Sequence, residues 1–507
     1  MAACRGAWTA VLAVLAGCAT APVATDEHAR LPSFERWTVK ELVRFEGEQE
    51  VSRYVRDLRR AGAARGAWWA RPRSNSDEGD IIVTGSRIVP RNPSITNVQE
   101  EGVDEGDIVK QIDRFLIVLQ DGRLFSLDTN ADGRGALALA DRVDVYRSRE
   151  TAADWYDEIL VRGDRIVVTG YSYRHDVSEL SLFRLGPDGR FVAEAKFQIS
   201  SEDYYDPENY ATRLVGDNLI LYTPLDLTQL SPRQPVRVPT VRRLGRYGEA
   251  AEPRRPDRAD IYRPLQLSYE PTLHSIAVCP IGAAARGRLD CRTTSFIGPS
   301  PRKFYATPDD IFLWLVNDEE ESRHLVDEAR CNASPGGPEN SVGSVLYRLP
   351  VSGGDPSVLG LRGWGFDQFS LDVFRGRFRA LVHFYPETCD PDADLEEEPP
   401  LDLGYAELAL AQFGGVLRDA PNSAFSRLPS LPEGELANRF TDTHLVYGPL
   451  LARKWSEDGD PEPVPSPLIL VPLARPDAPL RLELPHNIFR AERAGEDIVL
   501  TGYRPGG

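Results

Sequence analysis

The chain has 507 residues, of which 41% are hydrophobic and 27% are charged, as in an ordinary globular protein. Its formal net charge of −18 disfavours nucleic acid and anionic lipid headgroups as general partners, because both bind clustered lysine and arginine. The 41 glycines and 40 prolines predict many turns.

The first residues predict export. Arg5 precedes the short apolar run Ala10–Leu15, which is too short to cross a bilayer, since a span needs about 20 apolar residues. Leu15-Ala16-Gly17-Cys18 resembles a bacterial lipobox, which implies cleavage before Cys18 and acylation of its thiol. An ordinary signal peptide that contains a cysteine is the alternative. Ala19 in place of aspartate resembles lipoproteins of the outer membrane that face the periplasm or the cell surface.

The sequence predicts four segments. A lipoprotein signal peptide covers residues 1–17, a tether 18–35, a helical leader and linker 36–95, and the main domain 96–507. Within the leader, the apolar spacing predicts a helix from Glu48 to Ala61 with Gly62 as its C-cap. The run DIIVTGSRI at Asp80–Ile88 is of the β type.

Seven β-favouring runs, each opened by a short charged or glycine turn, recur through the main domain. They are Ile112–Leu119, Asp164–Gly170, Gly216–Tyr222, Asp309–Val316, Arg377–His383, Asp442–Gly448 and Glu496–Gly502. This irregular repeat predicts an all-β fold, an irregular β-propeller of seven or eight blades with a short N-terminal helical segment. A complete four-stranded blade is expected within residues 155–194, with a hairpin turn at Pro187-Asp188-Gly189.

Three segments break the repeat and are rich in proline and charge. They are Ser231–Pro264, Asp390–Leu403 and Ser456–Pro467. Little hydrophobic periodicity remains in them, so we expect exposed loops.

Four cysteines remain once Cys4 is removed with the signal and Cys18 is acylated. An even number in an oxidising compartment predicts two disulfides. Cys279 and Cys291 flank a short hairpin loop, so we expect them to pair, which leaves Cys331 and Cys389 as the second pair. None lies in a CxxC motif, which argues against a zinc ribbon or redox catalysis.

The segment Thr96–Lys110 reads TNVQEEGVDEGDIVK and resembles the opening motif TN-Q-x-x-GVDEADIVK of a family of secreted bacterial and archaeal proteins. The family carries a C-terminal β-propeller distantly related to WD repeats. This chain departs from the pattern at Gly106, where alanine is usual. Further echoes are GDRIVVTG at 163–170, ATRLVGDNLILYT at 211–223, ADIYRP at 259–264 and DQFSLD at 367–372. The resemblance implies fold and export, and no activity.

Members of this family look longer than this chain, which stops just after a strand. Propellers avoid exposed sheet edges by closing the ring. We therefore expect either that the domain is truncated at its C-terminus or that an N-terminal strand such as Asp80–Ile88 completes the last blade.

Asp104, Glu105 and Asp107 form a dense acidic group that could ligate calcium, which prefers six to eight oxygen ligands. The alternative is a structural turn whose carboxylates accept backbone N–H groups and pair with Lys110, locking the first blade to the last. Asp128–Gly133 matches half of a calcium loop, but a hairpin turn explains it. Otherwise no cofactor is expected.

Two further groups could line a site. His383 and His444 lie within strand runs and could face the central channel, although no local metal-binding spacing is present. Tyrosines and tryptophans near residues 155–210 would suit a sugar or peptide groove, or else pack between blades. Catalytic residues are not identified, and an enzyme is not favoured.

The function predicted from these features is non-catalytic. It is the binding or scaffolding of an envelope protein, peptide or polymer on a propeller face, with membrane contact only through the lipid anchor and no nucleic acid partner. One alternative is a hydrolase or lyase with carboxylates at the channel mouth. Another is a calcium-stabilised structural module.

Overall fold

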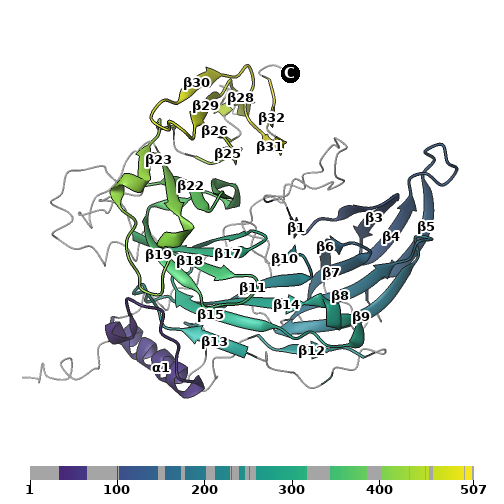
Figure 1. The fold of residues 1–507 in the computed structure, drawn as a ribbon, viewed down its shortest axis with the longest axis horizontal. Helices are drawn as coiled ribbons and strands as arrows, with labels where there is room; N and C mark the ends of the chain where they lie inside the picture. Colours follow the sequence, from purple (N-terminus) through teal and green to yellow (C-terminus); the bar gives the residue numbers. More distant parts are fainter. Residues whose placement is uncertain are drawn as a thin grey trace, which may run out of the picture.

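A computed structural model gives the fold. It describes residues 34–65, 100, 102–146, 155–172, 177–200, 212–228, 230, 239–245, 251, 258–316, 343–384, 401–432, 434–450, 453–455, 461–495 and 497–504. The prediction of an all-β propeller is confirmed: mainly antiparallel sheets follow one another in chain order around an arc (Figure 1). Within these ranges no helix is both long and apolar enough to span a membrane.

The described residues of this arc form seven sheets, numbered here in chain order. Sheet 1 contains β2 (Val109–Ile112), β3 (Phe115–Gln120), β4 (Arg123–Asp128) and β5 (Ala138–Asp144). Sheet 2 contains β6 (Trp155–Arg162), β7 (Arg165–Ser172), β8 (Val177–Leu185), β9 (Phe191–Ser200) and β12 (Val241–Arg243). Sheet 3 contains β1 (Val103–Glu105), β10 (Thr212–Val215), β11 (Asn218–Asp226), β14 (Thr272–Pro280), β15 (Arg292–Gly298) and β13 (Arg258–Tyr262).

The arc continues with four more sheets. Sheet 4 contains β16 (Arg302–Ala306), β17 (Asp310–Val316), β18 (Gly343–Pro350) and β19 (Ser357–Arg362). Sheet 5 contains β20 (Trp364–Gly365), β21 (Leu371–Phe374), β22 (Arg377–His383), β23 (Leu403–Ala409) and β24 (Phe425–Arg427). Sheet 6 contains β25 (Leu436–Phe440), β26 (His444–Pro449), β29 (Pro467–Pro472) and β30 (Leu480–Glu483); sheet 7 contains β31 (Arg490–Ala494) and β32 (Asp497–Thr501). A separate hairpin pairs β27 (Arg453–Trp455) with β28 (Pro461–Pro463).

Each pair of successive sheets encloses one apolar cluster. Phe115 of sheet 1 packs with Phe183 of sheet 2, for example, and Phe312 of sheet 4 packs with Phe378 of sheet 5. Such stacking hides both faces of most sheets from water, which is the main stabilising contribution in this fold. The last cluster, between sheets 6 and 7, is smaller, and Leu480 on the outer strand of sheet 6 stays 61% exposed.

The helix prediction is confirmed at its start and wrong at its end. Helix α1 runs from Glu48 to Arg65, so Gly62 lies inside it and does not cap it. Gly62 is buried, and a small residue is compatible with close packing there despite a helix-propensity cost of about 1 kcal/mol. Tyr54 and Leu58 on the inner face pack against sheet 3 together with Trp37.

The prediction of exposed loops is wrong in part for two segments, because each contains at least one short strand. Ser231–Pro264 contributes β12 to the edge of sheet 2 and β13 to the edge of sheet 3, and β28 falls within Ser456–Pro467. These strands are short and lie at edges, where proline-rich and irregular sequence is tolerated, so periodicity does not reveal them. Asp80–Ile88 and Asp390–Pro400 lie outside the described residues.

Candidate functional site

The acidic motif that opens the main domain folds into the inner side of the arc. β1 pairs antiparallel with β10, its neighbour at the inner edge of sheet 3, and Asp107 bridges to Ile159 of sheet 2. Lys110 Nζ donates to Asp104 Oδ1 at 2.8 Å, and the backbone N–H of Val161 donates to the other Asp104 oxygen. The motif therefore connects sheets 1, 2 and 3, and a lock between the first and the last blade stays a prediction.

Two carboxylates of the acidic group, Asp104 and Glu105, lie against cationic side chains of the protein itself. Burial raises the pKa of Asp104, and the ion pair with Lys110 opposes that rise. Asp107 Oδ1 accepts the N–H of Ile108. Among the residues that the structure describes, no group of three histidine, cysteine or acidic side chains is arranged to hold a metal ion. The geometry thus matches the structural alternative, while calcium binding by these residues stays an untested prediction.

Glu105 connects the acidic motif to residues at the centre of the arc. Its carboxylate lies 3.6 Å from Nε of Arg213, whose side chain is only 1% exposed. Arg213 Nη2 also donates to Gln368 Oε1 at 2.9 Å. Three segments far apart in the sequence meet here, and each belongs to a stretch that carries the family resemblance.

Gln368 lies next to Arg213 because the inner strand of sheet 5 is interrupted. A single 3₁₀ turn, η6 (Gln368–Ser370), separates β20 from β21. Asp367 caps the turn, since its Oδ1 accepts both the N–H and the hydroxyl of Ser370, while Asn438 Nδ2 of sheet 6 donates to the same oxygen at 3.0 Å. The cap fixes the turn, and the turn presents Gln368 and Phe369.

Arg439 on the inner strand of sheet 6 completes the group. Its guanidinium lies 3.3 Å from the ring centroid of Phe369, and its Nη1 donates to the carbonyl of Asn438. Burial lowers the pKa of Arg439 to about 10, opposed by Asp367 and assisted by Arg490. No carboxylate of the described chain forms an ion pair with this guanidinium.

We call this group the central cluster. Its members are Glu105, Arg213, Asp367, Gln368, Phe369, Asn438 and Arg439. The sequence predicts Glu105 as a site residue, and Arg213 and Gln368 lie in stretches that resemble the family, but neither arginine is predicted as a site residue. A buried-strand arginine gives no local spacing signal, and only the fold shows that Arg213 and Arg439 come from inner strands.

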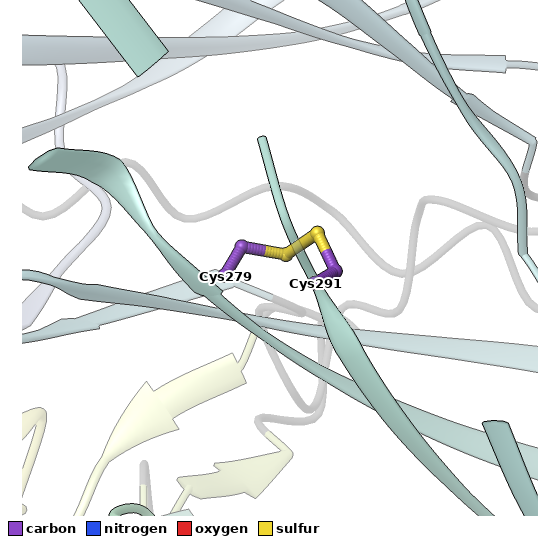
Figure 2. Close-up of a disulfide and its surroundings, with 2 residues drawn as sticks. All are labelled: Cys279 and Cys291. Atoms are coloured by element: carbon purple, nitrogen blue, oxygen red, sulfur yellow. A yellow bond between two sulfur atoms is a disulfide. The ribbon is translucent and has the colours of Figure 1, made fainter. Parts of the chain in front are cut away.

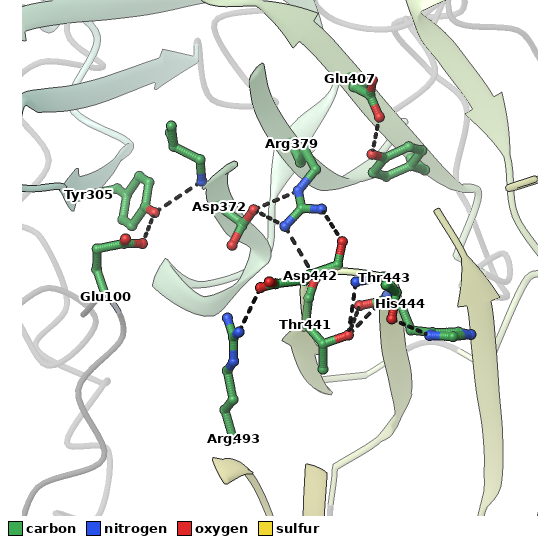
Figure 3. A network of polar contacts seen from close by, with 12 residues as sticks. Glu100, Tyr305, Asp372, Arg379, Glu407, Thr441, Asp442, Thr443, His444 and Arg493 are labelled. Atoms are coloured by element: carbon green, nitrogen blue, oxygen red, sulfur yellow. Dashed lines mark hydrogen bonds and ion pairs between the residues drawn. The ribbon is translucent and has the colours of Figure 1, made fainter. Parts of the chain in front are cut away.

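A second polar network joins sheets 4 to 7 (Figure 3). Arg379 Nε donates to Asp372 Oδ2 at 2.6 Å, and its two Nη atoms donate to the carbonyls of Thr441 and Asp442 in the β25–β26 turn. Asp442 in turn pairs with Arg493 of sheet 7 at 2.7 Å. These groups hold one another, so the network ties sheets together.

The predicted histidines lie away from the centre. His383 is on β22 and stacks on Phe366, with ring centroids 5.5 Å apart, while His444 on β26 contacts the hydroxyl of Thr443. Both strands are second in their sheets, so neither histidine lies on an inner edge strand. Of the aromatic group, Tyr171 is buried between sheets; most of the others lie outside the described residues.

The remaining predicted residues fall elsewhere. Cys279 and Cys291 are joined by a disulfide across β14 and the start of β15, with Cα atoms 4.1 Å apart and both side chains buried (Figure 2). Cys18, Cys331 and Cys389 lie outside the described residues. Asp128–Gly133 forms part of the β4–β5 hairpin connection, where Asp132 accepts the N–H groups of Arg134 and Ala136.

A family model described as a β-propeller domain matches residues 93–398. The match covers more than half of the chain, so the protein belongs to this β-propeller domain family. A search of curated proteins finds no match.

Solved structures add a weak likeness. An apocarotenoid oxygenase mutant from Synechocystis is 10% identical, with 77% of this chain and 64% of that one covered and a TM-score of 0.26. A prolyl endopeptidase structure is 10% identical, with 76% and 50% covered and a TM-score of 0.25. The chain thus spans less than two thirds of the length of either protein, and scores this low carry no argument about function.

Proposed function

We propose that this protein is a non-catalytic binding module, anchored by a lipid at Cys18 to the outer membrane and facing the periplasm or the cell surface. Its partner is an envelope protein, peptide or polymer, and the central cluster holds an anionic group of that partner. The lipobox resemblance supports the anchor, and the geometry of Arg439 supports the choice of site.

The observation that carries this proposal is the state of Arg439. Its guanidinium is partly buried, stacked on Phe369, and without an ion pair among the described residues. A guanidinium loses hydration on burial and gains from an anion that restores its hydrogen bonds. The stack on Phe369 fixes the planar group, so a carboxylate can bind with little further loss of side-chain entropy.

The carboxylates nearby support binding over acid–base chemistry. Glu105 faces Arg213, and Asp367 accepts three hydrogen bonds from Ser370 and Asn438. A general acid or base must exchange a proton with substrate, and these groups are engaged by the protein itself. A hydrolase or lyase would require a different carboxylate at the channel mouth.

Affinity capture tests the proposal. The acylated protein is immobilised and incubated with envelope extract, and co-purifying molecules are identified by mass spectrometry. We expect one partner to be retained by the wild type and lost with Arg439→Gln. Arg375→Gln is the matched control, because Arg375 also lies over a phenylalanine, Phe374, at 4.8 Å but is exposed on a hairpin turn. Equal capture by both variants would contradict the assignment of the site.

A further inference from the structure

The outward face of α1 is basic in an otherwise acidic chain. From Ser52 to Arg65 the helix contains five arginines and a single acidic residue, Asp57, whereas the whole chain has a net charge of −18. Three of these arginines are exposed and spaced for one helical face, and we call them the arginine stripe: Arg53, Arg56 and Arg60.

Two acidic residues of this helix, Glu50 and Asp57, face inward. Glu50 pairs with Arg263 at 2.6 Å, and Asp57 pairs with Arg36 at 2.7 Å while accepting from Trp37 Nε1. Both carboxylates are buried, and their charge is matched locally. Two acidic side chains, Glu46 and Glu48, are exposed at the start of the helix, away from the stripe.

The stripe is partly free of intramolecular pairing and fixed in orientation. Arg53 and Arg56 form no ion pair within the described chain, and Arg60 lies 3.7 Å from Asp57 with its side chain 62% exposed. The opposite helix face is buried against sheet 3 through Tyr54 and Leu58. Helix α1 lies on the outside of the arc of sheets (Figure 1).

We propose that the arginine stripe docks this edge of the propeller on an anionic phospholipid surface. Guanidinium groups bind phosphate bidentately, and each arginine near an anionic membrane contributes about 1 kcal/mol. The acidity of the whole chain does not oppose this contact, because charges beyond about 10 Å are largely screened at physiological salt. The stripe sets which edge of the propeller faces the membrane.

The anchor proposed at Cys18 would bring the stripe close to the membrane. Fifteen residues separate Cys18 from Phe34, which allows a reach of roughly 50 Å. The docking proposal rests on the proposed anchoring for this proximity only. Its test therefore uses the full chain without acylation, carrying Cys18→Ala, so that failure of the anchor and failure of the stripe give separate results.

Vesicle co-sedimentation measures the contact. We expect the unacylated protein to bind phosphatidylcholine vesicles that contain phosphatidylglycerol, to bind pure phosphatidylcholine poorly, and to be released by high salt. Loss of three arginines in R53Q/R56Q/R60Q should weaken partitioning about fivefold per residue, or about a hundredfold in total. The matched control R134Q/R142Q/R475Q removes the same charge from exposed arginines elsewhere and should change partitioning less than twofold by the same reasoning.

Arginines in the last turns of a helix also stabilise it through the helix dipole, so the melting temperature of each variant is recorded in parallel. A drop in partitioning without loss of the folded state supports docking. The docking proposal is overturned if the wild-type protein binds vesicles equally with and without phosphatidylglycerol. It is also overturned if the stripe and control variants partition equally. If only the acylated protein binds membranes, the proposal of a lipid anchor stands and the proposal of docking through the arginine stripe is rejected.

Discussion

Arg379 holds Asp372 across the β21–β22 hairpin and, with the same guanidinium, reaches into the next sheet. Its Nε lies 2.6 Å from the Asp372 carboxylate, and its Nη atoms donate to the carbonyls of Thr441 and Asp442. Burial raises the pKa of Asp372, and the ion pair with Arg379 opposes this rise. The side chain of Arg379 is 4% exposed, so one residue connects two propeller sheets through a buried contact.

Arg379→Lys should destabilise the fold by about 2 kcal/mol. Lysine keeps the positive charge but lacks the planar guanidinium group. It therefore cannot donate hydrogen bonds to Asp372 and to both turn carbonyls at once. Urea unfolding measures the loss. The control is Arg377→Lys on the same strand, where the side chain is 54% exposed and the change should stay within about 0.5 kcal/mol. Equal losses at the two positions would contradict the role of Arg379.

Gly106→Ala, which restores the residue usual in the resembling family, should be unfavourable in this chain. A Cβ at Gly106 would lie 2.4 Å from Cδ of Glu158, which is buried and accepts a hydrogen bond from Thr169. Glu158 would have to move inside packed surroundings, at a cost of about 1–2 kcal/mol. Gly415→Ala is the control, because nothing lies within 4 Å of its Cβ position. A more stable Gly106→Ala variant would refute this steric reading.

Replacing Cys279 and Cys291 with alanine should lower the free energy of unfolding by roughly 3 kcal/mol. The bond closes a loop with a sequence separation of 12, and such a link restricts the unfolded chain. Denaturant titration with and without reductant measures the effect, and the double variant should no longer respond to reductant through this pair. Peptide mapping of the non-reduced protein also tests the second predicted pair, Cys331 with Cys389; four free thiols would reject both.

Acid should destabilise the protein through His274. Complete burial lowers the pKa of His274 to about 3, and its ring nitrogens contact the hydroxyl of Tyr222 and the carbonyl of Pro299. Between pH 3 and 6.5 the unfolded chain binds a proton that the folded chain excludes, so stability falls as pH falls through this window. This residue alone should remove about 2 kcal/mol between pH 7 and pH 5.

His274→Asn removes the side chain that takes up a proton in the unfolded chain. The variant is expected to be less stable at pH 7 because it loses packing and one hydrogen bond, but its stability should change less between pH 7 and pH 5 than that of the wild type. Urea unfolding at the two pH values gives both slopes. Parallel slopes would show that His274 does not titrate on unfolding.

The sequence predicted the strands that lie next to the inner edge strand of their sheets. The runs at Asp164–Gly170 and Arg377–His383 coincide with β7 and β22, which have neighbours on both edges and a sheet on each face. Such strands need continuous apolar residues, and this pattern is visible without a structure. The hairpin turn before β9 was also predicted, because Pro187-Asp188-Gly189 carries local turn chemistry, and Gly189 has a φ of +80°.

The edges and the centre could not be predicted in the same way. β12 and β13 are short edge strands, whose residues need only one pairing partner and so carry little periodicity. The central cluster unites Glu105, Gln368 and Arg439 across more than three hundred residues, and its geometry depends on how sheets 3, 5 and 6 are placed. Only the three-dimensional fold determines such a juxtaposition.

Calorimetric titration of the captured partner against wild-type protein, Arg439→Gln and Arg375→Gln is the most direct test of the binding function. Loss of a charge-assisted hydrogen bond of about 1.5–3 kcal/mol should weaken the affinity of Arg439→Gln by about one to two orders of magnitude. Arg375→Gln should bind like the wild type. An Arg439→Gln protein that is folded and binds the partner with unchanged affinity would contradict recognition at the centre of the propeller.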